Sequence, residues 1–295
     1  VVSVCFSCVM NAVAGPEHRY ELMSRRWSIL GLTSAITVAL VGQVLDLLRF
    51  PMNYQVVFMG LSLGGLISFA FSHQIKVPDN PPEPEAVHIS LAERLQGYAG
   101  IIRHERPFVS FVWKRFLFLS GISFTAPLFP LYFVRQLQAS DAAIGAINTT
   151  FTAIMLVGYY IWGHVSRRRG ARTVLLCTTL GLALYPAAIA CTGRVEMVIL
   201  LAGLAGVLQA GLDLVFFDEL MKRVPPEQSP TFVSLAQALQ YLSTLAAPLL
   251  GTVLADRIGI SGGLLVGAAI RLVGFAAFAL GREKIVRPAP ASTSQ

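Results

Sequence analysis

Long apolar runs alternate with short polar segments along almost the whole chain. Eight of these runs approach or reach the roughly 20 residues that a helix needs to cross a bilayer. They cover residues 28–47, 54–72, 108–134, 142–162, 173–191, 196–217, 231–255 and 262–280. Residues 1–14 are also apolar but shorter, as expected for the end of a further helix. The pattern therefore predicts an all-α membrane protein with eight full transmembrane helices and a partial one.

Composition and the placement of charge strengthen this prediction and give it an orientation. The chain is 55% hydrophobic and 13% charged, whereas soluble domains are about 25% charged. If the polar segments alternate between the two sides of the membrane, 18 of the 23 Lys and Arg residues lie on one side. These segments are 15–27, 73–115, 163–172, 218–230 and 281–295. The positive-inside rule puts that side, with the C-terminus, in the cytoplasm.

The same rule sets the expected location and partners of the chain. We expect a multi-pass protein of the cell membrane, which is the cytoplasmic inner membrane if the source is bacterial. The net charge of +7 then faces the cytoplasm. A basic rim of this kind is attracted to anionic lipid headgroups. The expected partner is therefore the lipid bilayer and not nucleic acid.

The longest polar segment divides the chain. We expect residues 1–72 to belong to one helical unit, 73–107 to a linker, 108–281 to a six-helix unit and 282–295 to a tail. Prolines and acids between Lys76 and Ser90 predict an extended linker. Ser90 and Glu93 then form a capping box that starts an amphipathic helix, which we expect to lie in the membrane interface.

No metal, cofactor or catalytic chemistry is expected from the sequence. Cys5 and Cys8 have the spacing of a redox or metal pair, but their neighbours are apolar and no second ligand pair follows. Residues three apart simply share one face of a helix. Phosphate-binding loops, zinc-protease motifs, nucleophile elbows and paired catalytic carboxylates do not occur in the sequence. We therefore expect that the chain is not an enzyme.

Polar side chains inside the apolar runs are the candidates for contact with a transported solute, because they are costly when they face lipid. The candidate substrate-binding residues are Ser123, Asn148, Gln209, Gln237, Gln240 and Tyr241. The alternative is that such residues only bond neighbouring helices. Two prolines, Pro127 and Pro130, follow Ser123 and predict a kink or break in its helix.

Apart from charges at the ends of the runs, and from Lys114 and Arg115, which also belong to the polar segment 73–115, Asp213 and Arg271 are the two charged residues inside the apolar runs. Asp213 is a candidate for carrying the proton that drives transport, and the alternative is that it only reaches the membrane interface. Arg271 lies near the middle of its run, where exposure to lipid would be expensive. We expect it to be a buried charge that points toward 196–217 or 231–255 and meets an acid or backbone carbonyls. A pair with Asp213 is one such arrangement.

The segment GHVSRRRGAR, from Gly163 to Arg172, resembles a signature of the major facilitator superfamily, G-x-x-x-D-R-x-G-R-[RK]. Gly163, Arg168, Gly170 and Arg172 match it, whereas Arg167 stands at the aspartate position and Ala171 at an arginine position. In that family this loop helps to hold the cytoplasmic side closed. The resemblance therefore makes Gly163, Arg167, Arg168, Gly170 and Arg172 candidate gate residues. The alternative is plain cytoplasmic charge.

An internal repeat supports the same resemblance. Three features recur at an offset of 210 residues: Pro16–Glu17 with Pro226–Glu227, Ser24 with Ser234, and Asp46 with Asp256. Transporters of this family consist of two six-helix halves, and parallel repeats of this kind relate the halves. The resemblance implies that the chain holds helices 4 to 12 of a 12-helix fold. Helices 1 to 3 and the start of helix 4 are then missing, and residues 1–14 are the end of helix 4.

The function implied is secondary active transport of a small organic solute by alternating access. Proton-coupled efflux is the expected mode, with protons as the coupling ion, a small-molecule substrate and a monomeric carrier. A nutrient uptake carrier for a sugar or organic acid is the first alternative. The second is a membrane scaffold without transport or an integral-membrane enzyme.

Overall fold

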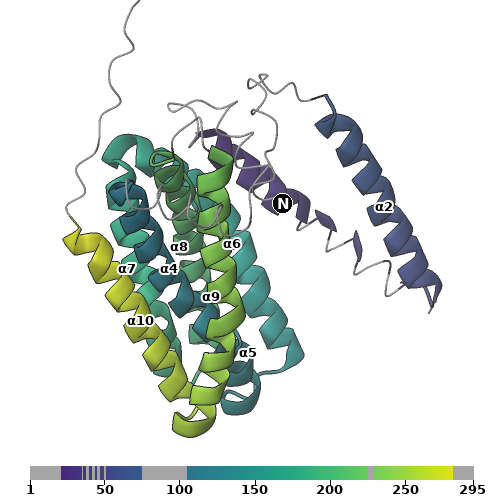
Figure 1. The fold of residues 1–295 in the computed structure, drawn as a ribbon. Helices are drawn as coiled ribbons and strands as arrows, with labels where there is room; N and C mark the ends of the chain where they lie inside the picture. The colour runs from purple at the N-terminus through teal and green to yellow at the C-terminus, as the bar shows by residue number, and fades with distance from the viewer. Residues whose placement is uncertain are drawn as a thin grey trace, which may run out of the picture.

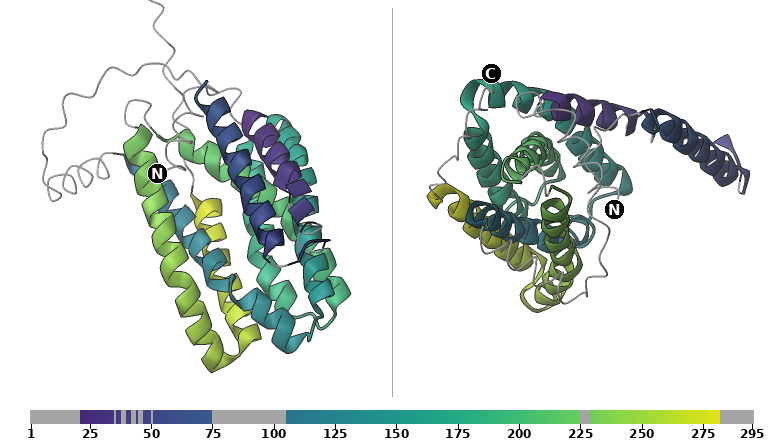
Figure 2. Two further views of the ribbon diagram at one scale, coloured as in Figure 1. Left: turned by 90° about the vertical axis from the view of Figure 1, so that its right-hand side faces the viewer. Right: turned by 45° about the horizontal axis from the view of Figure 1, so that its top comes forward.

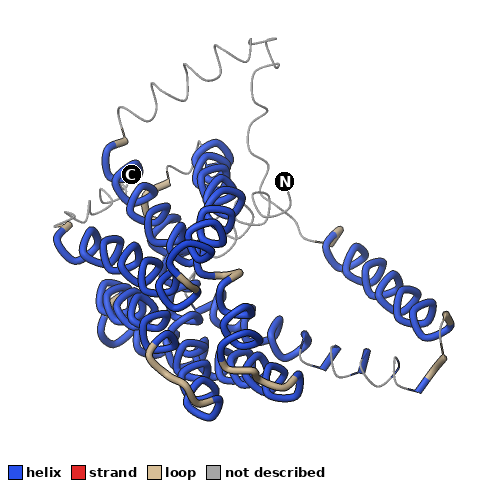
Figure 3. The backbone as a smooth tube through the Cα atoms, turned by 90° about the horizontal axis from the view of Figure 1, so that it is seen from below, coloured by secondary structure: helices blue, strands red, loops and turns tan. Residues whose placement is uncertain are grey.

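The computed structural model describes residues 21–74, without 35, 38–39, 42–43, 45–46 and 50, together with 105–224 and 229–281. Every regular element in this part of the chain is a helix (Figure 3). Seven of these helices are long and apolar enough to cross a membrane, which confirms the all-α membrane fold. The predicted run at 28–47 falls partly outside the described residues. Residues 1–14 with Cys5 and Cys8, the linker helix after Ser90 and the tail lie outside them entirely.

The six runs after the linker form one antiparallel bundle (Figure 1). Its elements are α4 (Arg106–Thr125), α5 (Leu128–Leu131), the π-helix η1 (Tyr132–Gln136), α6 (Asp141–Arg169), α7 (Ala171–Ala190), α8 (Val195–Met221), α9 (Ser229–Ile258) and α10 (Ile260–Leu280). α4, α5 and η1 together make one span, Arg106–Gln136. The alternation puts Arg169, Ala171 and Met221 at one end of the bundle. We name this the basic end, after Arg167, Arg168, Arg169, Arg172, Lys222 and Arg223.

Two local features of the sequence set turns in the structure. α4 ends at Thr125 and the chain turns at Ala126 and Pro127, because a proline inside a helix removes a backbone hydrogen bond. The turn between α6 and α7 consists of Gly170 alone, whose φ is +80°. A residue with a β-carbon is strained at this φ, so glycine is required there.

The predicted polar loop at 163–172 is shorter than expected. α6 continues as a helix through Arg169 and α7 begins at Ala171, so most of the basic signature is helical. The prediction was wrong because charged residues at the end of a helix resemble a loop in hydropathy. Three arginines in the last turn also favour the helix, since they meet the negative end of its dipole.

Close backbone crossings hold the bundle together. A β-carbon on Gly206 of α8 would lie 2.3 Å from the Phe151 carbonyl oxygen of α6. A β-carbon on Gly251 of α9 would lie 2.2 Å from the Phe124 carbonyl oxygen of α4. Helices in membranes associate through such small residues, because apolar burial alone does not drive them together.

Among the described residues before the linker, two helices differ in their contacts. The helix of residues 21–34 packs on α6, where Met23 and Trp27 join Tyr159 in one apolar cluster with Leu214 of α8. α2 (Met52–Ser72) stands apart from the bundle and extends away from α6 (Figures 1 and 2). Of the residues described before the linker, those of the helix 21–34 therefore provide the contact with the six-helix bundle.

Candidate functional site

A hydrogen-bonded carboxylate lies between α6 and α8. The spacing of four residues puts Gln209 and Asp213 on one face of α8, and Gln209 Nε2 donates to Asp213 Oδ1 at 2.8 Å. The hydroxyl of Tyr159, on α6, donates to Asp213 Oδ2 at 2.9 Å. Both carboxylate oxygens therefore have a neutral partner. Asp213 points into the bundle, so the expectation that it only reaches the membrane interface does not describe its side chain.

Tyr159 is a part of this group that was not among the sequence candidates. Its side chain is almost fully buried, and its ring lies 5.3 Å from that of Trp27. Its backbone carbonyl accepts a hydrogen bond of 2.6 Å from the hydroxyl of Ser24, in the helix of residues 21–34. Tyr159 thus connects Asp213 to the first part of the chain. Tyr159 lies one turn before Gly163, where the basic signature begins. The signal that could have identified it is its polar hydroxyl inside the apolar run 142–162.

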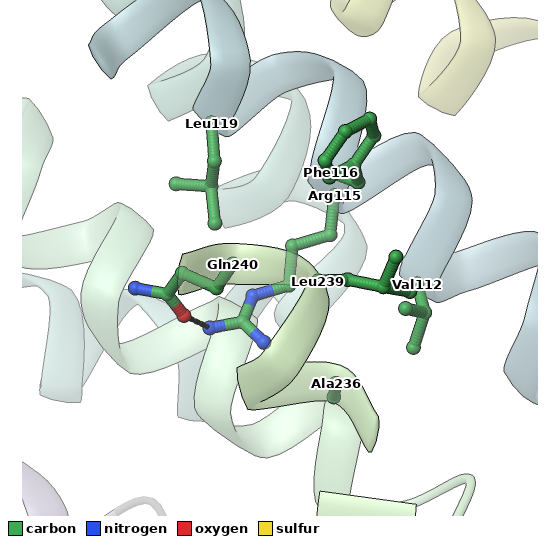
Figure 4. A pocket seen from close by; sticks show the side chains of 7 residues that line it. All are labelled: Val112, Arg115, Phe116, Leu119, Ala236, Leu239 and Gln240. Carbon is green, nitrogen blue, oxygen red and sulfur yellow. Dashed lines mark hydrogen bonds between the residues drawn. The ribbon is translucent and has the colours of Figure 1, made fainter. Parts of the chain in front are cut away.

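Arg115 is a second residue near Asp213 that was not among the candidates. In the sequence it belongs both to the polar segment 73–115 and to the apolar run 108–134, and the structure puts it well inside α4. Its Nη2 donates to Gln240 Oε1 of α9 at 2.6 Å (Figure 4). It also lies close enough to Asp213 for the opposite charges to attract. Pro107 was the missed signal, since a proline in the first turn of a helix marks its start upstream of Arg115.

The groove around Arg115 and Gln240 has no room for a solute. Its free volume is about 0 Å³, and α4 and α9 supply all of its lining (Figure 4). The lining residues are Val112, Arg115, Phe116, Leu119, Ala236, Leu239 and Gln240. This contact is therefore a filled junction between two helices rather than a binding pocket.

A cavity of about 260 Å³ lies inside the bundle. It brings together the predicted residues Asn148, Gln209 and Arg271, which come from α6, α8 and α10. The remaining lining is apolar or aromatic: Ile122, Ala126, Phe129, Phe133, Ile147, Phe151, Leu182, Tyr185, Ala202 and Ala205. Gln209 belongs both to this cavity and to the Asp213 group, so the two are directly connected.

Arg271 points inward and donates to a backbone carbonyl, as expected, but that carbonyl belongs to a different helix than expected. It is 3% exposed, and its Nη1 donates to the Leu182 carbonyl of α7 at 2.9 Å. Its Nη2 donates to the hydroxyl of Thr125 at the end of α4. The expectation that it points toward α8 or α9 was wrong, because α10 packs between α4 and α7. Within the described residues, its guanidinium makes no ion pair with Asp213.

The other predicted substrate residues lie outside the cavity. Tyr241 is 56% exposed on α9, and Gln237 is half-buried on the same helix. Ser123 is half-buried on α4, directly after the cavity residue Ile122 and about one turn before Ala126. Gln237 and Tyr241 therefore do not line the cavity, and Gln240 of the same helix reaches Arg115 instead.

The basic end carries the second predicted group. Arg167 Nη1 lies 3.0 Å from Glu21 Oε2 on the helix of residues 21–34. A β-carbon on Gly163 would lie 2.7 Å from Ser24 Oγ, so this glycine allows the close approach of the two helices. Arg168 and Arg172 are exposed. Arg167, which stands at the aspartate position of the signature, thus pairs with an acid on the neighbouring helix.

Lys222 and Arg223 follow the end of α8 at the same end of the bundle. Lys222 Nζ lies 2.6 Å from Asp218 Oδ2 and 3.1 Å from Glu219 Oε1, and Arg223 Nη1 lies 2.7 Å from Glu219 Oε2. Burial alone would lower the pKa of Lys222, but the attraction of Asp218 and Glu219 outweighs it and raises the pKa. These cations also meet the negative end of the α8 dipole.

The comparison with known protein families gives a match. A family model described as Major Facilitator Superfamily matches residues 115–295, which include all of the cavity and the Asp213 group. The search of curated proteins finds no match.

Proposed function

Since this chain belongs to the major facilitator superfamily, a family of secondary transporters of small solutes, we propose that it exports a small organic solute in exchange for protons. Alternating access would expose the solute site first to one side of the membrane and then to the other. Asp213 is the proposed proton carrier. The cavity beside it, with Asn148 and Gln209, is the proposed solute site.

The hydrogen bonds of Asp213 are the single observation that carries this proposal. A phenol and a side-chain amide can each donate or accept a hydrogen bond. Tyr159 and Gln209 can therefore satisfy Asp213 both as a carboxylate and as a carboxylic acid. An unpaired carboxylate in a membrane span would be costly. A carboxyl group whose two forms are both satisfied suits repeated loading and release of a proton.

Arg115 supplies a route from the proton to helix packing. The attraction between Arg115 and Asp213 exists only while the carboxyl group of Asp213 is charged. Arg115 is also hydrogen-bonded to Gln240 of α9. Protonation of Asp213 would remove one of the forces that keep α4 and α9 in their present positions relative to α8. We propose that this change favours the movement of helices that alternating access requires.

The basic end is the proposed cytoplasmic side of the cell membrane, with the C-terminus on the same side. There the Glu21–Arg167 pair and the Ser24–Tyr159 hydrogen bond join the helix of residues 21–34 to α6. We propose that Gly163, Arg167 and Gly170 act as a gate at this end, with the exposed Arg168 and Arg172 beside them. Here the base, Arg167, is on α6 and the acid, Glu21, is on the other helix, whereas the family has an acid at the position of Arg167. The ion pair would hold the gate closed in either arrangement.

The decisive experiment compares Asp213→Asn with the wild-type protein in proteoliposomes that contain a pH-sensitive dye. Benzenesulfonate, glucose and ethidium would be added one at a time to cover anionic, neutral and cationic solutes. We expect at least one to drive a proton flux in the wild type and none to do so in Asp213→Asn. The amide keeps hydrogen-bonding capacity but cannot become charged. Asp256→Asn, at the exposed opposite end, is the matched control and should behave as wild type.

The same recordings decide between export and uptake. Protons and solute that move in opposite directions support export by exchange. Movement in the same direction supports the uptake carrier instead. If Asp213→Asn retains the full solute-driven proton flux, then Asp213 is not the proton carrier.

A further inference from the structure

Arg271 is a buried positive charge whose observed partners are all neutral. An arginine side chain has five N–H donors and stays charged in proteins. Here one donor is used by the Leu182 carbonyl and one by the hydroxyl of Thr125. Its Nε, which is also buried, has no hydrogen-bond partner among the described residues. A charge in this state inside a membrane span is expensive, and an opposite charge would relieve the cost.

Asp213 does not provide that opposite charge. Its two oxygens are occupied by Tyr159 and Gln209, and the arginine whose charge it attracts is Arg115. In the part of the chain that the structure describes, no ion pair includes Arg271. Tyr185, which lines the same cavity, offers a phenol rather than a carboxylate.

The cavity at Arg271 has the form of a site for a small amphipathic molecule. Its volume of about 260 Å³ is near the lower end of the ligand pockets found in proteins, which begin at about 300 Å³. The aromatic side chains of Phe129, Phe133 and Tyr185 line it. The amides of Asn148 and Gln209 add polar groups at the wall. Apolar walls with a few polar groups are the usual composition of small-molecule sites.

We infer that this cavity binds a small aromatic organic anion, with its acidic group at Arg271 and its ring among the aromatic side chains. The inference rests on the proposed transport function and names the class of solute. A planar carboxylate matches the fork of N–H groups on a guanidinium. A cation would be repelled, and a neutral solute would leave the charge of Arg271 uncompensated. The alternative to an anion site is that Arg271 only joins α10 to α4 and α7.

Three solutes of nearly equal size separate these readings: benzoate, benzamide and benzylamine. Binding is measured at equilibrium on the purified protein in detergent, with radiolabelled benzoate and competition by the other two. We expect benzoate to bind about 10- to 100-fold more tightly than benzamide, because hydrogen bonds to a charged partner are the stronger kind. Benzylamine should bind more weakly than benzamide.

Arg271→Gln is the critical variant. It should lower the affinity for benzoate to the level of benzamide and leave the affinity for benzamide unchanged, which also shows that the cavity is intact. Arg271→Lys should retain part of the preference, because it keeps the charge but loses the fork. Arg257→Gln removes one exposed positive charge from the opposite end of the bundle and should keep the full preference.

Two results would overturn the inference. One is equal binding of benzoate and benzamide by the wild type. The other is an equal loss of both ligands in Arg271→Gln, as expected if Arg271 only supports the packing of α10. The binding assay needs no proton gradient, so its failure leaves the proton-flux test of Asp213 untouched. Conversely, a strong benzoate preference without any solute-driven proton flux would support the site and contradict the transport mechanism.

Discussion

The substitution Gly206→Ala tests how closely α6 and α8 must approach each other. The added β-carbon would lie 2.3 Å from the carbonyl oxygen of Phe151 and 3.2 Å from the backbone nitrogen of Met155. Ordinary contacts begin near 3.4 Å, so the two helices would have to separate by roughly 1 Å. Backbone atoms of a helix cannot move aside individually. The whole contact between α6 and α8 must therefore yield.

The magnitude follows from two opposing effects. Overpacking in a tight core costs about 1–3 kcal/mol, whereas replacing a helical glycine by alanine stabilises the helix by roughly 1 kcal/mol. Gly145→Ala, on α6, is the matched control, because its β-carbon would have nothing within 4 Å. Gly145→Ala should therefore show only the gain in helix stability and not the overpacking. The two variants should therefore differ in the free energy of unfolding by about 1–3 kcal/mol.

The assay is thermal unfolding of the purified protein in detergent, and the amount of folded monomer that remains is measured at each temperature. At about 2–4 °C per kcal/mol for a chain of this size, Gly206→Ala should unfold several degrees below Gly145→Ala. Gly206 is also next to the cavity residues Ala205 and Gln209, so benzoate binding should weaken in the same variant. A Gly206→Ala protein that unfolds at the temperature of Gly145→Ala would falsify the close crossing of the two helices.

Two further predictions concern the basic end. Gly170→Ala should lower the free energy of unfolding by about 1–2 kcal/mol, because a φ of +80° strains any residue that has a β-carbon. Thermal unfolding of this variant and of Gly145→Ala measures the difference. Equal stability of the two variants would contradict the single-residue turn. A double-mutant cycle with Glu21→Gln and Arg167→Gln should give a coupling of only about 0.2–1 kcal/mol, because both side chains are partly exposed. The coupling should fall in 1 M salt, and a large, salt-independent value would refute the assignment as a surface pair.

The helices after the linker could be predicted from the sequence because the membrane imposes a simple rule. A span must be apolar for about 20 residues, and its backbone must bond within itself. Local chemistry added the break at Pro127 and the turn at Gly170, since both depend on the allowed φ of one residue. The ends of α4 and α6 were predicted less accurately, because charged residues near the end of a helix have the same low hydropathy as a loop.

Part of the candidate site was also accessible from the sequence. Polar residues inside apolar runs identified Asn148, Gln209 and Asp213, and the spacing of four residues placed the last two on one face. Tyr159 was harder to identify, because its hydrogen bond to Asp213 joins residues 54 positions apart. Arg115 was missed because it was counted with the basic residues of the segment 73–115, although the apolar run 108–134 also contains it.

The sequence by itself determined that this chain crosses the membrane, where most helices lie and which end is rich in arginine. These properties depend on the transfer of each segment from water to lipid, which is a sum over local residues. Only the tertiary structure decided the partners of Asp213, Arg115 and Arg271, and which polar residues share the cavity. Those partners depend on how helices far apart in the chain rotate and cross, and the close approach of their backbones sets this arrangement.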